Sequence, residues 1–206
     1  MSQITHGLRA ILSHPKIYDA FQNIMGAKQI RQELVSDFIR PCAGEKILDV
    51  GCGTAEILAF FSAEVSYFGY DPSPEYIAAA EKRYGSRAKF ICGLLNDDEL
   101  KKLPPMDIVL AIGVLHHLDD NSALDFFRLA KSSLRQGGRI ITIDPCFSDT
   151  QNPLARFLVS KDRGMCVRNS DGYLHLASRE NFRSVEGTLR HRVWVPYTHW
   201  IMQCTI

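Results

Sequence analysis

Two glycines follow a short apolar run near residue 50, and their position could bring a ligand close to the backbone. Gly51 and Gly53 carry no side chains, and N–H groups at the start of a following helix favour an anionic group. Asp71 comes 20 residues after Gly51, and its carboxylate can accept hydrogen bonds from both hydroxyls of a ribose. This spacing predicts a site for a nucleoside-containing cofactor. The alternative is that the glycines form a tight turn and Asp71 caps the next helix.

The same turn argues against a dinucleotide. The fingerprint G-x-G-x-x-G requires glycine at position 56, and this chain has Glu56 there. A carboxylate at that position would crowd and repel a pyrophosphate. We therefore expect that NAD is not the cofactor.

Short apolar runs alternate with helical segments through the middle of the chain. Strands are expected at 46–50, 65–70, 88–92, 107–112 and 139–144, and helices at 54–63, 74–84, 96–102 and 121–134. Strands separated by helices in this way require right-handed crossovers and a parallel sheet that is covered on both faces. The pattern predicts a doubly wound α/β fold, in which ligands bind beyond the carboxyl ends of the strands.

A single domain with three parts is expected. They are an N-terminal helical lid at 1–43, a cofactor-binding core at 44–146, and a substrate-side loop with a C-terminal hairpin at 147–206. In the last part we expect a helix at 152–159, a charged loop at 162–169, and two antiparallel strands at 182–191 and 193–205. Because the start of the chain lacks a secretory signal and no apolar run is long enough to span a bilayer, we expect a cytoplasmic protein with no membrane partner.

Four ordered motifs resemble those of class I S-adenosylmethionine-dependent methyltransferases. They are ILDVGCGTAEIL, YFGYDPSPEYIAAA, DIVLAIGVLHHLDD and LRQGGRIITIDP. The resemblance implies a Rossmann-like, mostly parallel seven-stranded sheet with an antiparallel last strand, and S-adenosyl-L-methionine as the cofactor. It implies cofactor contacts from Asp49, Gly51, Cys52, Gly53, Asp71, Pro72, Leu94, Ile112, Gly113 and His117.

The chain departs from the family pattern at two places. Ala55 stands where the family often has a third glycine, and a small residue should still fit. The family often has an acid after the third strand to meet the adenine amino group, but here Cys92 is followed by Gly-Leu-Leu-Asn-Asp. Leu94 could pack on the adenine ring, and Asp97 could reach it only if the loop folds back. The adenine contact is left open.

Three titratable residues at the same sheet edge are candidate catalytic groups. Methyl transfer from a sulfonium depends mainly on positioning, and a base is needed only if the acceptor is a hydroxyl or a protonated amine. His116 and His117 follow the fourth expected strand, where an imidazole could take a proton near neutral pH, and Asp144 is a rival base. The alternative is that the histidines hold the loop and the cofactor, and that Asp144 caps the helix beyond Pro145.

A cationic segment is the candidate substrate site. The residues after position 150 include eight basic and four acidic side chains, and Arg163 and Arg168 lie within the charged loop. Planar guanidinium groups bind carboxylate or phosphate with two prongs, so these arginines could clamp an anionic substrate. An exposed salt-bridged loop is the alternative. Tyr18 on the expected lid is a further candidate substrate contact.

Composition limits the partners that we expect. The formal net charge of +1 is small for a surface that grips many phosphates, so we expect no nucleic-acid partner. The six cysteines include no C-x-x-C pair, and no metal site is predicted. The leading hypothesis is an enzyme that methylates a small, possibly anionic molecule. Alternatives are a catalytically silent S-adenosylmethionine-binding regulatory subunit and, less favoured, an NAD-dependent oxidoreductase. The oligomeric state is left open.

Overall fold

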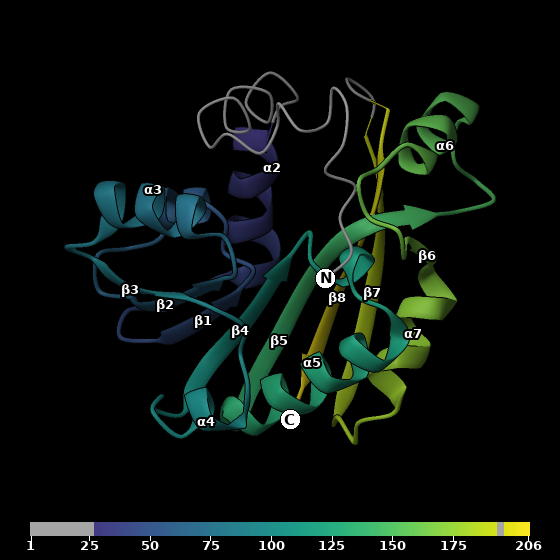
Figure 1. Ribbon diagram of the computed structural model, residues 1–206. Coiled ribbons are helices and arrows are strands. Elements are labelled where there is room, and N and C mark those ends of the chain that lie inside the picture. The colour runs from purple at the N-terminus through teal and green to yellow at the C-terminus, as the bar shows by residue number, and fades with distance from the viewer. Residues whose placement is uncertain (1–26, 193–195) are drawn as a thin grey trace.

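The computed structural model describes residues 27–192 and 196–206, and its centre is one twisted sheet (Figure 1). Its strands are β1 (Lys46–Val50), β2 (Ser66–Asp71), β3 (Ala88–Cys92), β4 (Met106–Ile112), β5 (Leu134–Phe147), β6 (Arg168–Asn169), β7 (Ser184–His191) and β8 (Thr198–Thr205). The order across the sheet is β3-β2-β1-β4-β5-β8-β7, and the short β6 pairs with the end of β5. Strands β1 to β5 pair in parallel, whereas β8 is antiparallel to both β5 and β7. The predicted doubly wound fold with an antiparallel last strand is confirmed.

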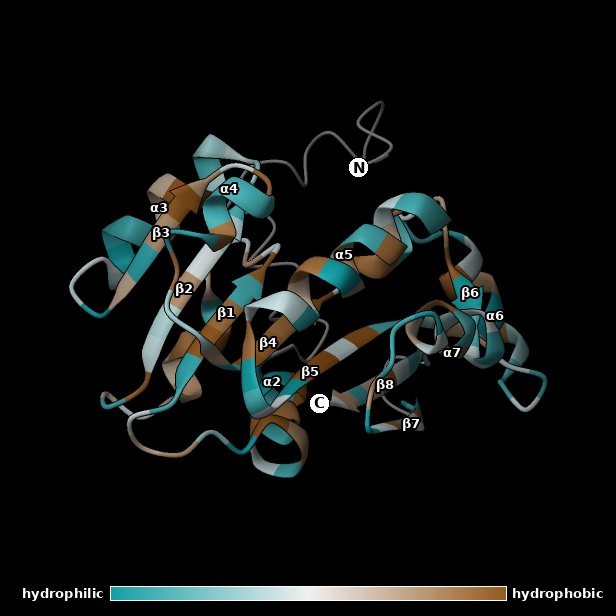
Figure 2. Cartoon of the chain, turned by 90° about the horizontal axis from the view of Figure 1, so that it is seen from below, coloured by the Kyte–Doolittle hydropathy of each residue, from teal (hydrophilic) through white to brown (hydrophobic). Residues whose placement is uncertain are grey.

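Helices cover both faces of the sheet (Figure 1). They are α2 (Ala27–Leu34), the π-helical turn η2 (Val35–Ile39), the 3₁₀ turns η3 (Glu56–Phe60) and η4 (Leu115–His117), α3 (Pro74–Tyr84), α4 (Asp97–Leu100), α5 (Asp120–Ser133), α6 (Pro153–Ser160) and α7 (Ser170–Ser178). Neighbouring residues of β4 point to opposite faces, because side chains alternate along a strand. Val109 therefore packs in a core with α5 and α7, and Ile108 packs in a second core with α2 and α3. Brown, apolar segments dominate the strands between these helices (Figure 2).

The expected helix at 54–63 is reduced to the short 3₁₀ turn η3. Ala55 adopts a left-handed conformation with φ of 56°, which a helix cannot contain, so the turn begins only at Glu56. Ala55 is fully buried and has no freedom to move outward. The smaller residue that the family often has at this position is therefore consistent with a backbone that must turn sharply here.

Helix α7 is a part of the fold that the sequence patterns did not predict. The segment contains Gly172 and several small polar residues, which lowers its helix propensity. Two signals were present: Asn169 caps the helix by accepting a hydrogen bond from the Gly172 N–H at 2.9 Å, and Tyr173 and Leu176 are buried one turn apart. The predicted charged loop thus ends at a helix that packs against α5.

The predicted lid is described only in part. Residues 1–26 lie outside the described residues, and with them Tyr18. Helix α2 packs close to η3, beside the glycine turn. None of the helices within 27–192 and 196–206 is long and apolar enough to cross a membrane.

Candidate functional site

The glycine turn is tied directly to the end of β2. The N–H groups of Gly51 and Cys52 donate to the carbonyl oxygen of Tyr70 at 2.7 and 3.0 Å, and the Gly53 N–H donates to Asp71 Oδ2 at 3.0 Å. Gly51 and Gly53 have φ of 76° and 54°, which favours glycine at both positions. The structure therefore brings together the two glycines and the aspartate that were predicted to bind a nucleoside.

Asp71 keeps acceptor capacity for a ligand although its carboxylate already binds the backbone. Its Oδ1 accepts the Ser73 N–H at 2.8 Å, and its Oδ2 accepts the Gly53 N–H. Burial raises the pKa of the carboxyl, and these two N–H donors act in the opposite direction. Each oxygen accepts one of the roughly two hydrogen bonds that its lone pairs allow. Asp71 thus shapes the turn and can still receive two ribose hydroxyls.

Asp49, which precedes the glycine turn, has one carboxyl oxygen without a hydrogen-bond partner among the described residues. Its Oδ2 accepts the hydroxyl of Tyr67 at 2.5 Å, whereas its buried Oδ1 has no hydrogen-bond partner among the described residues. Burial raises the pKa of this carboxyl to about 7, against the effect of the Tyr67 hydrogen bond. Buried polar atoms are almost always paired, so an unpaired carboxylate oxygen indicates that a cationic ligand group belongs beside it. The ammonium and sulfonium of S-adenosylmethionine fit this requirement.

Open space for a ligand is present beside glycines that follow the strands. A Cβ added at Gly53 or at Gly93 would meet no atom within 4 Å. One added at Gly113, which has φ of 70°, would find only His116 Cε1, at 3.7 Å. The described residues thus leave open space beside the ends of three parallel strands, as a bound nucleoside requires. These observations fit the cofactor that the resemblance implies.

The remaining predicted cofactor residues lie along the same edge. Ile112 ends β4 and is half-buried, while Pro72 follows β2 and Leu94 follows β3, with Leu94 57% exposed. Burial raises the pKa of the Cys52 thiol, with Asp49 acting in the same direction, so this thiol stays neutral. An exposed leucine beside the open space at Gly93 is in a position to pack on a ring.

Asp97 does not turn toward that open space. It lies at the start of α4, and Arg128 Nη1 and Nη2 donate to its two carboxylate oxygens at 2.8 and 3.1 Å. Both partners are exposed, and α4 lies against α5. An adenine contact from Asp97 would require breaking this two-pronged pair, so the geometry does not support that alternative.

His116 is held between two carboxylates. Its Nδ1 lies 2.8 Å from Asp144 Oδ1, and its Nε2 lies 3.2 Å from Asp162 Oδ1. Burial alone would lower the pKa of this imidazole, but the hydrogen bonds to Asp144 and Asp162 raise it to about 9. His116 is therefore a buried imidazolium near neutral pH and has no free nitrogen for a substrate proton.

His117 has the opposite character. Its ring centre lies 4.0 Å from that of His116, and its buried Nδ1 has no hydrogen-bond partner among the described residues. Burial, together with the charge of His116, lowers the pKa of His117 to about 3. Of the two histidines, His117 is the neutral one with an available nitrogen.

Asp162 and Tyr197 complete this polar cluster, and the sequence patterns did not single them out as site residues. The Tyr197 hydroxyl donates to Asp162 Oδ2, and the Gly164 N–H donates to Asp162 Oδ1 at 2.8 Å. Hydrogen bonds from His116 and Tyr197 hold the pKa of Asp162 below its usual range, although burial acts in the other direction. No sequence spacing links Asp162 to His116 or Tyr197, so only the tertiary fold reveals the cluster.

The two loop arginines have different environments. The Arg168 guanidinium donates to the carbonyl oxygens of Leu115 and Leu118 at 3.0 and 2.8 Å, and to Asp120 Oδ1 at 2.7 Å. These bonds occupy Arg168 in fixing the loop to η4 and α5, and the geometry does not support the predicted substrate contact. Arg163 is close enough to His117 for its charge to contribute to the lowered pKa of that imidazole. Arg163 therefore lies beside the polar cluster.

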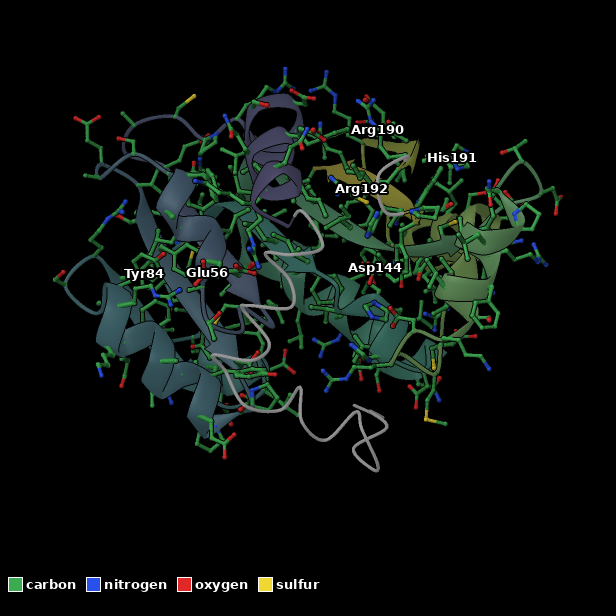
Figure 3. All side chains as sticks on the ribbon, turned by 90° about the horizontal axis from the view of Figure 1, so that it is seen from above. Glu56, Tyr84, Asp144, Arg190, His191 and Arg192 are labelled. Atoms are coloured by element: carbon green, nitrogen blue, oxygen red, sulfur yellow. The ribbon has the colours of Figure 1, made fainter. Side chains whose placement is uncertain are left out.

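Further cations lie at the β7 end of this edge. Seen from above, Arg190, His191 and Arg192 lie together on one side of Asp144, and Glu56 lies in a different direction from it (Figure 3). Burial lowers the pKa of His199, and the charge of Arg192 contributes to that shift. Arg192 also lies 3.8 Å from Glu33 of α2, and Arg190 lies over the ring of Phe38 in η2.

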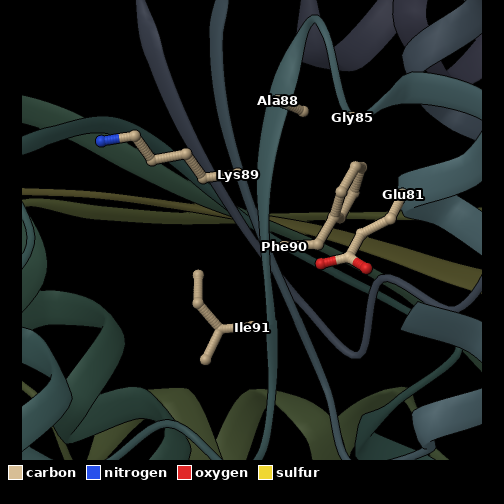
Figure 4. A pocket seen from close by; sticks show the side chains of 6 residues that line it. All are labelled: Glu81, Gly85, Ala88, Lys89, Phe90 and Ile91. Carbon is tan, nitrogen blue, oxygen red and sulfur yellow. The ribbon is translucent and has the colours of Figure 1, made fainter. Parts of the chain in front are cut away.

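An open hollow of about 500 Å³ is found elsewhere, between the end of α3 and the outer strand β3 (Figure 4). It is lined by Glu81, Gly85, Ala88, Lys89, Phe90 and Ile91. None of the predicted site residues lines it. This hollow is not part of the site at the carboxyl edge.

Comparison with known proteins confirms the resemblance. Residues 48–140 match the model of a family described as a methyltransferase domain. This span contains the glycine turn, Asp71 and both histidines. The match supports the resemblance to S-adenosylmethionine-dependent methyltransferases that the motifs indicated.

Solved structures share the fold at low sequence identity. An S-adenosylmethionine-dependent methyltransferase from Archaeoglobus fulgidus superposes with a TM-score of 0.71 and 15% identity, over 92% of this chain and 99% of the other. The S-adenosylmethionine-dependent methyltransferase SibL also gives a TM-score of 0.71, with 18% identity, over 90% of this chain and 57% of the other. Both likenesses confirm the Rossmann-like fold.

Curated relatives carry a more specific name. A tRNA U34 carboxymethyltransferase from Pseudoalteromonas translucida is 30% identical over 135 residues, which are 64% of this chain and 40% of the relative. The enzyme of the same name from Shewanella pealeana is 32% identical over 136 residues, with the same coverage. The chain thus spans about two fifths of the length of these relatives.

This name contradicts the expectation of no nucleic-acid partner. That expectation rested on the net charge of +1, and proteins that share this domain are named for a tRNA substrate. Net charge measures the whole surface, whereas an enzyme that reads one nucleotide needs cations only around its site. The net charge also averages over an excess of four basic side chains after position 150. The exclusion of nucleic acid was wrong.

Proposed function

We propose that this chain binds S-adenosylmethionine at the carboxyl edge of β1, β2 and β4 and transfers a methyl group to a nucleotide of tRNA. The observation that carries the cofactor half is the buried Asp49 Oδ1, which has no hydrogen-bond partner among the described residues, together with the open space at Gly53. The expected ligand approach at Gly51 is not supported, because a Cβ added there would lie 2.6 Å from Val114 Cγ2. The acceptor half is supported by the relatives named for tRNA. It is also supported by the cations at the β7 end of the edge.

The chain's own residues bind and orient the cofactor. Asp71 would accept the ribose hydroxyls, the backbone at Gly53 would lie against the ligand, and the Asp49 carboxylate would face its cationic end. When bound, S-adenosylmethionine supplies a methyl group on a sulfonium, which leaves as a neutral thioether and needs no protonation. Positioning by the protein therefore accounts for most of the rate enhancement.

His117 is the proton acceptor where the nucleotide atom that attacks carries a hydrogen. It is neutral near pH 7, and its buried Nδ1 has no hydrogen-bond partner among the described residues. The low pKa makes it a weak base, so it assists a proton that is already acidic. Asp144 supports His116 and does not face the acceptor alone, because its Oδ1 accepts from both the His116 N–H and the ring Nδ1.

Transfer of labelled methyl groups tests this proposal. Purified chain is incubated with methyl-labelled S-adenosylmethionine and either bulk tRNA, other RNA of matched length, or a small-metabolite extract. A second donor, an adenosyl sulfonium that carries a carboxymethyl group, is included because of the relatives' name. We expect label in tRNA and its loss in Asp71→Ala.

Two results would overturn parts of the proposal. Label in the metabolite extract and none in tRNA would overturn the acceptor. Absence of S-adenosylmethionine binding would overturn the cofactor. A preference for the carboxymethyl donor would correct the transferred group and leave the site as described.

A further inference from the structure

The loop at 161–169 is held at its end by Arg168, which donates to the carbonyl oxygen of Leu115 in η4, and at its start by His116. His116 bridges Asp144, at the end of β5, to Asp162, within the loop. Tyr197, just before β8, donates to the other oxygen of Asp162. We refer to Asp144, His116, Asp162 and Tyr197 as the bridge. His116 and Asp144 are both almost fully buried, so water does not compete strongly for these bonds.

The backbone of the loop follows the same side chain. The Cys166 N–H donates to the carbonyl oxygen of His116 at 2.9 Å. A Cβ added at Gly164 would lie 2.1 Å from His116 Cδ2 and 2.5 Å from its carbonyl oxygen. Only glycine fits at this position, because the loop lies directly on the imidazole. The loop therefore packs directly against His116, and we call this packing the seating of the loop.

His116 also touches the cofactor side of the edge. Its Cε1 is the atom nearest to a Cβ built on Gly113, at 3.7 Å. One imidazole therefore lies between the bare backbone of the cofactor edge and the loop that carries Arg163.

We propose that Asp162 and Tyr197 are positioning residues which act through His116 to hold the loop at 161–169 as the acceptor-side wall of the site. No bond is made or broken in this role, and neither residue touches the cofactor. This inference rests on the proposed function for its acceptor, whereas the seating of the loop is independent of it.

The bridge has a defined pH range. The titratable groups that face His116 are the carboxylates of Asp144 from β5 and Asp162 from the loop, and the imidazoles of His117 from η4 and His199 from β8. The pKa values of both imidazoles are lowered, mainly by burial, so only the two carboxylates are charged near neutral pH. The pKa of His116 is about 9, so the imidazolium that joins the two carboxylates is present below that pH and lost above it. The loop is therefore expected to release as the pH rises through about 9.

Kinetics of three variants test the acceptor role. Asp162→Asn removes the charge that faces His116, Tyr197→Phe removes one hydroxyl, and Asp98→Asn breaks an exposed ion pair with Lys101 as the control. At pH 7.5 we expect the KM for tRNA to rise about tenfold or more in Asp162→Asn and less in Tyr197→Phe. The Kd for S-adenosylhomocysteine is expected to change by less than twofold in all three. Asp162→Glu, which keeps the carboxylate, is expected to recover part of the loss.

The pH profile separates positioning from general destabilisation. In the parent the KM for tRNA rises above about pH 9, and in Asp162→Asn this rise begins at least one pH unit lower. An unchanged profile in Asp162→Asn would overturn the proposal. Loss of S-adenosylhomocysteine affinity in proportion to the KM would also overturn it, because the loop would then belong to the cofactor site.

Hydrogen exchange tests the seating of the loop without any acceptor. The amides of Gly164 and Cys166 donate to Asp162 Oδ1 and to the His116 carbonyl, so they report on the bridge directly. Protection factors are obtained by dividing out the intrinsic dependence of the exchange rate on pH. The protection factors of these two amides are expected to fall above pH 9 in the parent, and to be lower in Asp162→Asn than in the parent. Protection that stays constant would overturn the seating. Exchange as predicted with no transfer to tRNA would instead overturn the proposed acceptor. If Asp162→Asn does not fold, Tyr197→Phe serves for both measurements.

Discussion

The Tyr67 hydroxyl donates to Asp49 Oδ2 at 2.5 Å and leaves Oδ1 of the same carboxylate buried without a partner among the described residues. Tyr67 is on β2, two residues before Gly69, which is the register partner of Asp49 on the neighbouring strand β1. The pairing of these two strands therefore keeps both side chains close to each other. A half-satisfied buried carboxylate stabilises the fold poorly. It is well suited to receive a cationic group, and this is the feature that most strongly supports a sulfonium cofactor.

The first prediction concerns the pH dependence of cofactor binding. Burial raises the pKa of Asp49 to about 7, and an ammonium or sulfonium bound beside it favours the ionised form. Binding therefore releases a proton, and the affinity for S-adenosylhomocysteine is expected to rise by up to about tenfold per pH unit between pH 5 and 7. Titration calorimetry in buffers of different ionisation enthalpy measures the released proton.

Asp49→Asn is the matched variant for this prediction because it keeps the shape and cannot ionise. Its affinity should be lower at pH 8 and nearly independent of pH from 5 to 8. Proton release that is equal in Asp49→Asn and the parent would assign the effect to another group.

The second prediction concerns stability. The folded pKa of His116, about 9, lies above its unfolded value of about 6.5, so its contribution is complete below pH 6.5 and is lost as the pH rises through 9. The shift corresponds to about 3 kcal/mol of unfolding free energy between these limits. Denaturant unfolding of the parent and of His116→Gln at pH 6.5 and 9.5 measures it.

His116→Gln should be less stable than the parent at pH 6.5, and the two should converge at pH 9.5. A stability difference that is the same at both pH values would show that the imidazolium does not carry the charge that we assign to it.

The third prediction uses two glycines with similar backbone conformations. Gly53 and Gly44 have φ of 54° and 81°, and a Cβ at either would meet no atom within 4 Å. Gly44 lies before the amino end of β1, at the opposite edge of the sheet from the carboxyl ends, so Gly44→Val measures backbone strain alone. Gly53→Val should lose stability to a similar degree and should also lose S-adenosylhomocysteine binding.

Equal binding by the two valine variants would mean that the ligand does not approach the backbone at Gly53. Thermal unfolding, measured on the same samples, shows whether a loss of binding merely reflects a loss of folded protein.

The parallel core was predictable because its signals are local. The run from Lys46 to Val50 is bounded by glycines and is buried on both faces, and Ser73 with Pro74 marks the start of α3 by capping. Both elements have the predicted bounds. The cofactor edge followed, because parallel strands place their carboxyl ends together and so bring Asp71 to Gly53.

The acceptor side was not predictable in the same way. Asp162 binds His116, which lies 46 positions earlier in the sequence. Tyr197 binds Asp162 although the whole of α7 lies between them in the sequence. Arg168 is occupied by backbone carbonyls of η4, which no residue pattern reveals. The charged side chains of the loop could be identified in the sequence. Their binding partners could not, because these depend on how the loop packs in the folded chain.

The central claim is that the carboxyl edge of β1 and β2 binds S-adenosylmethionine, and one measurement tests it most directly. S-adenosylhomocysteine is titrated calorimetrically into the parent chain and into Asp71→Ala, with NAD as a comparison ligand. We predict saturable one-to-one binding to the parent and an affinity weaker by about 1.5 to 3 kcal/mol in Asp71→Ala, with the fold retained. The absence of binding to the parent, binding of NAD in its place, or the same dissociation constant in Asp71→Ala would contradict the claim.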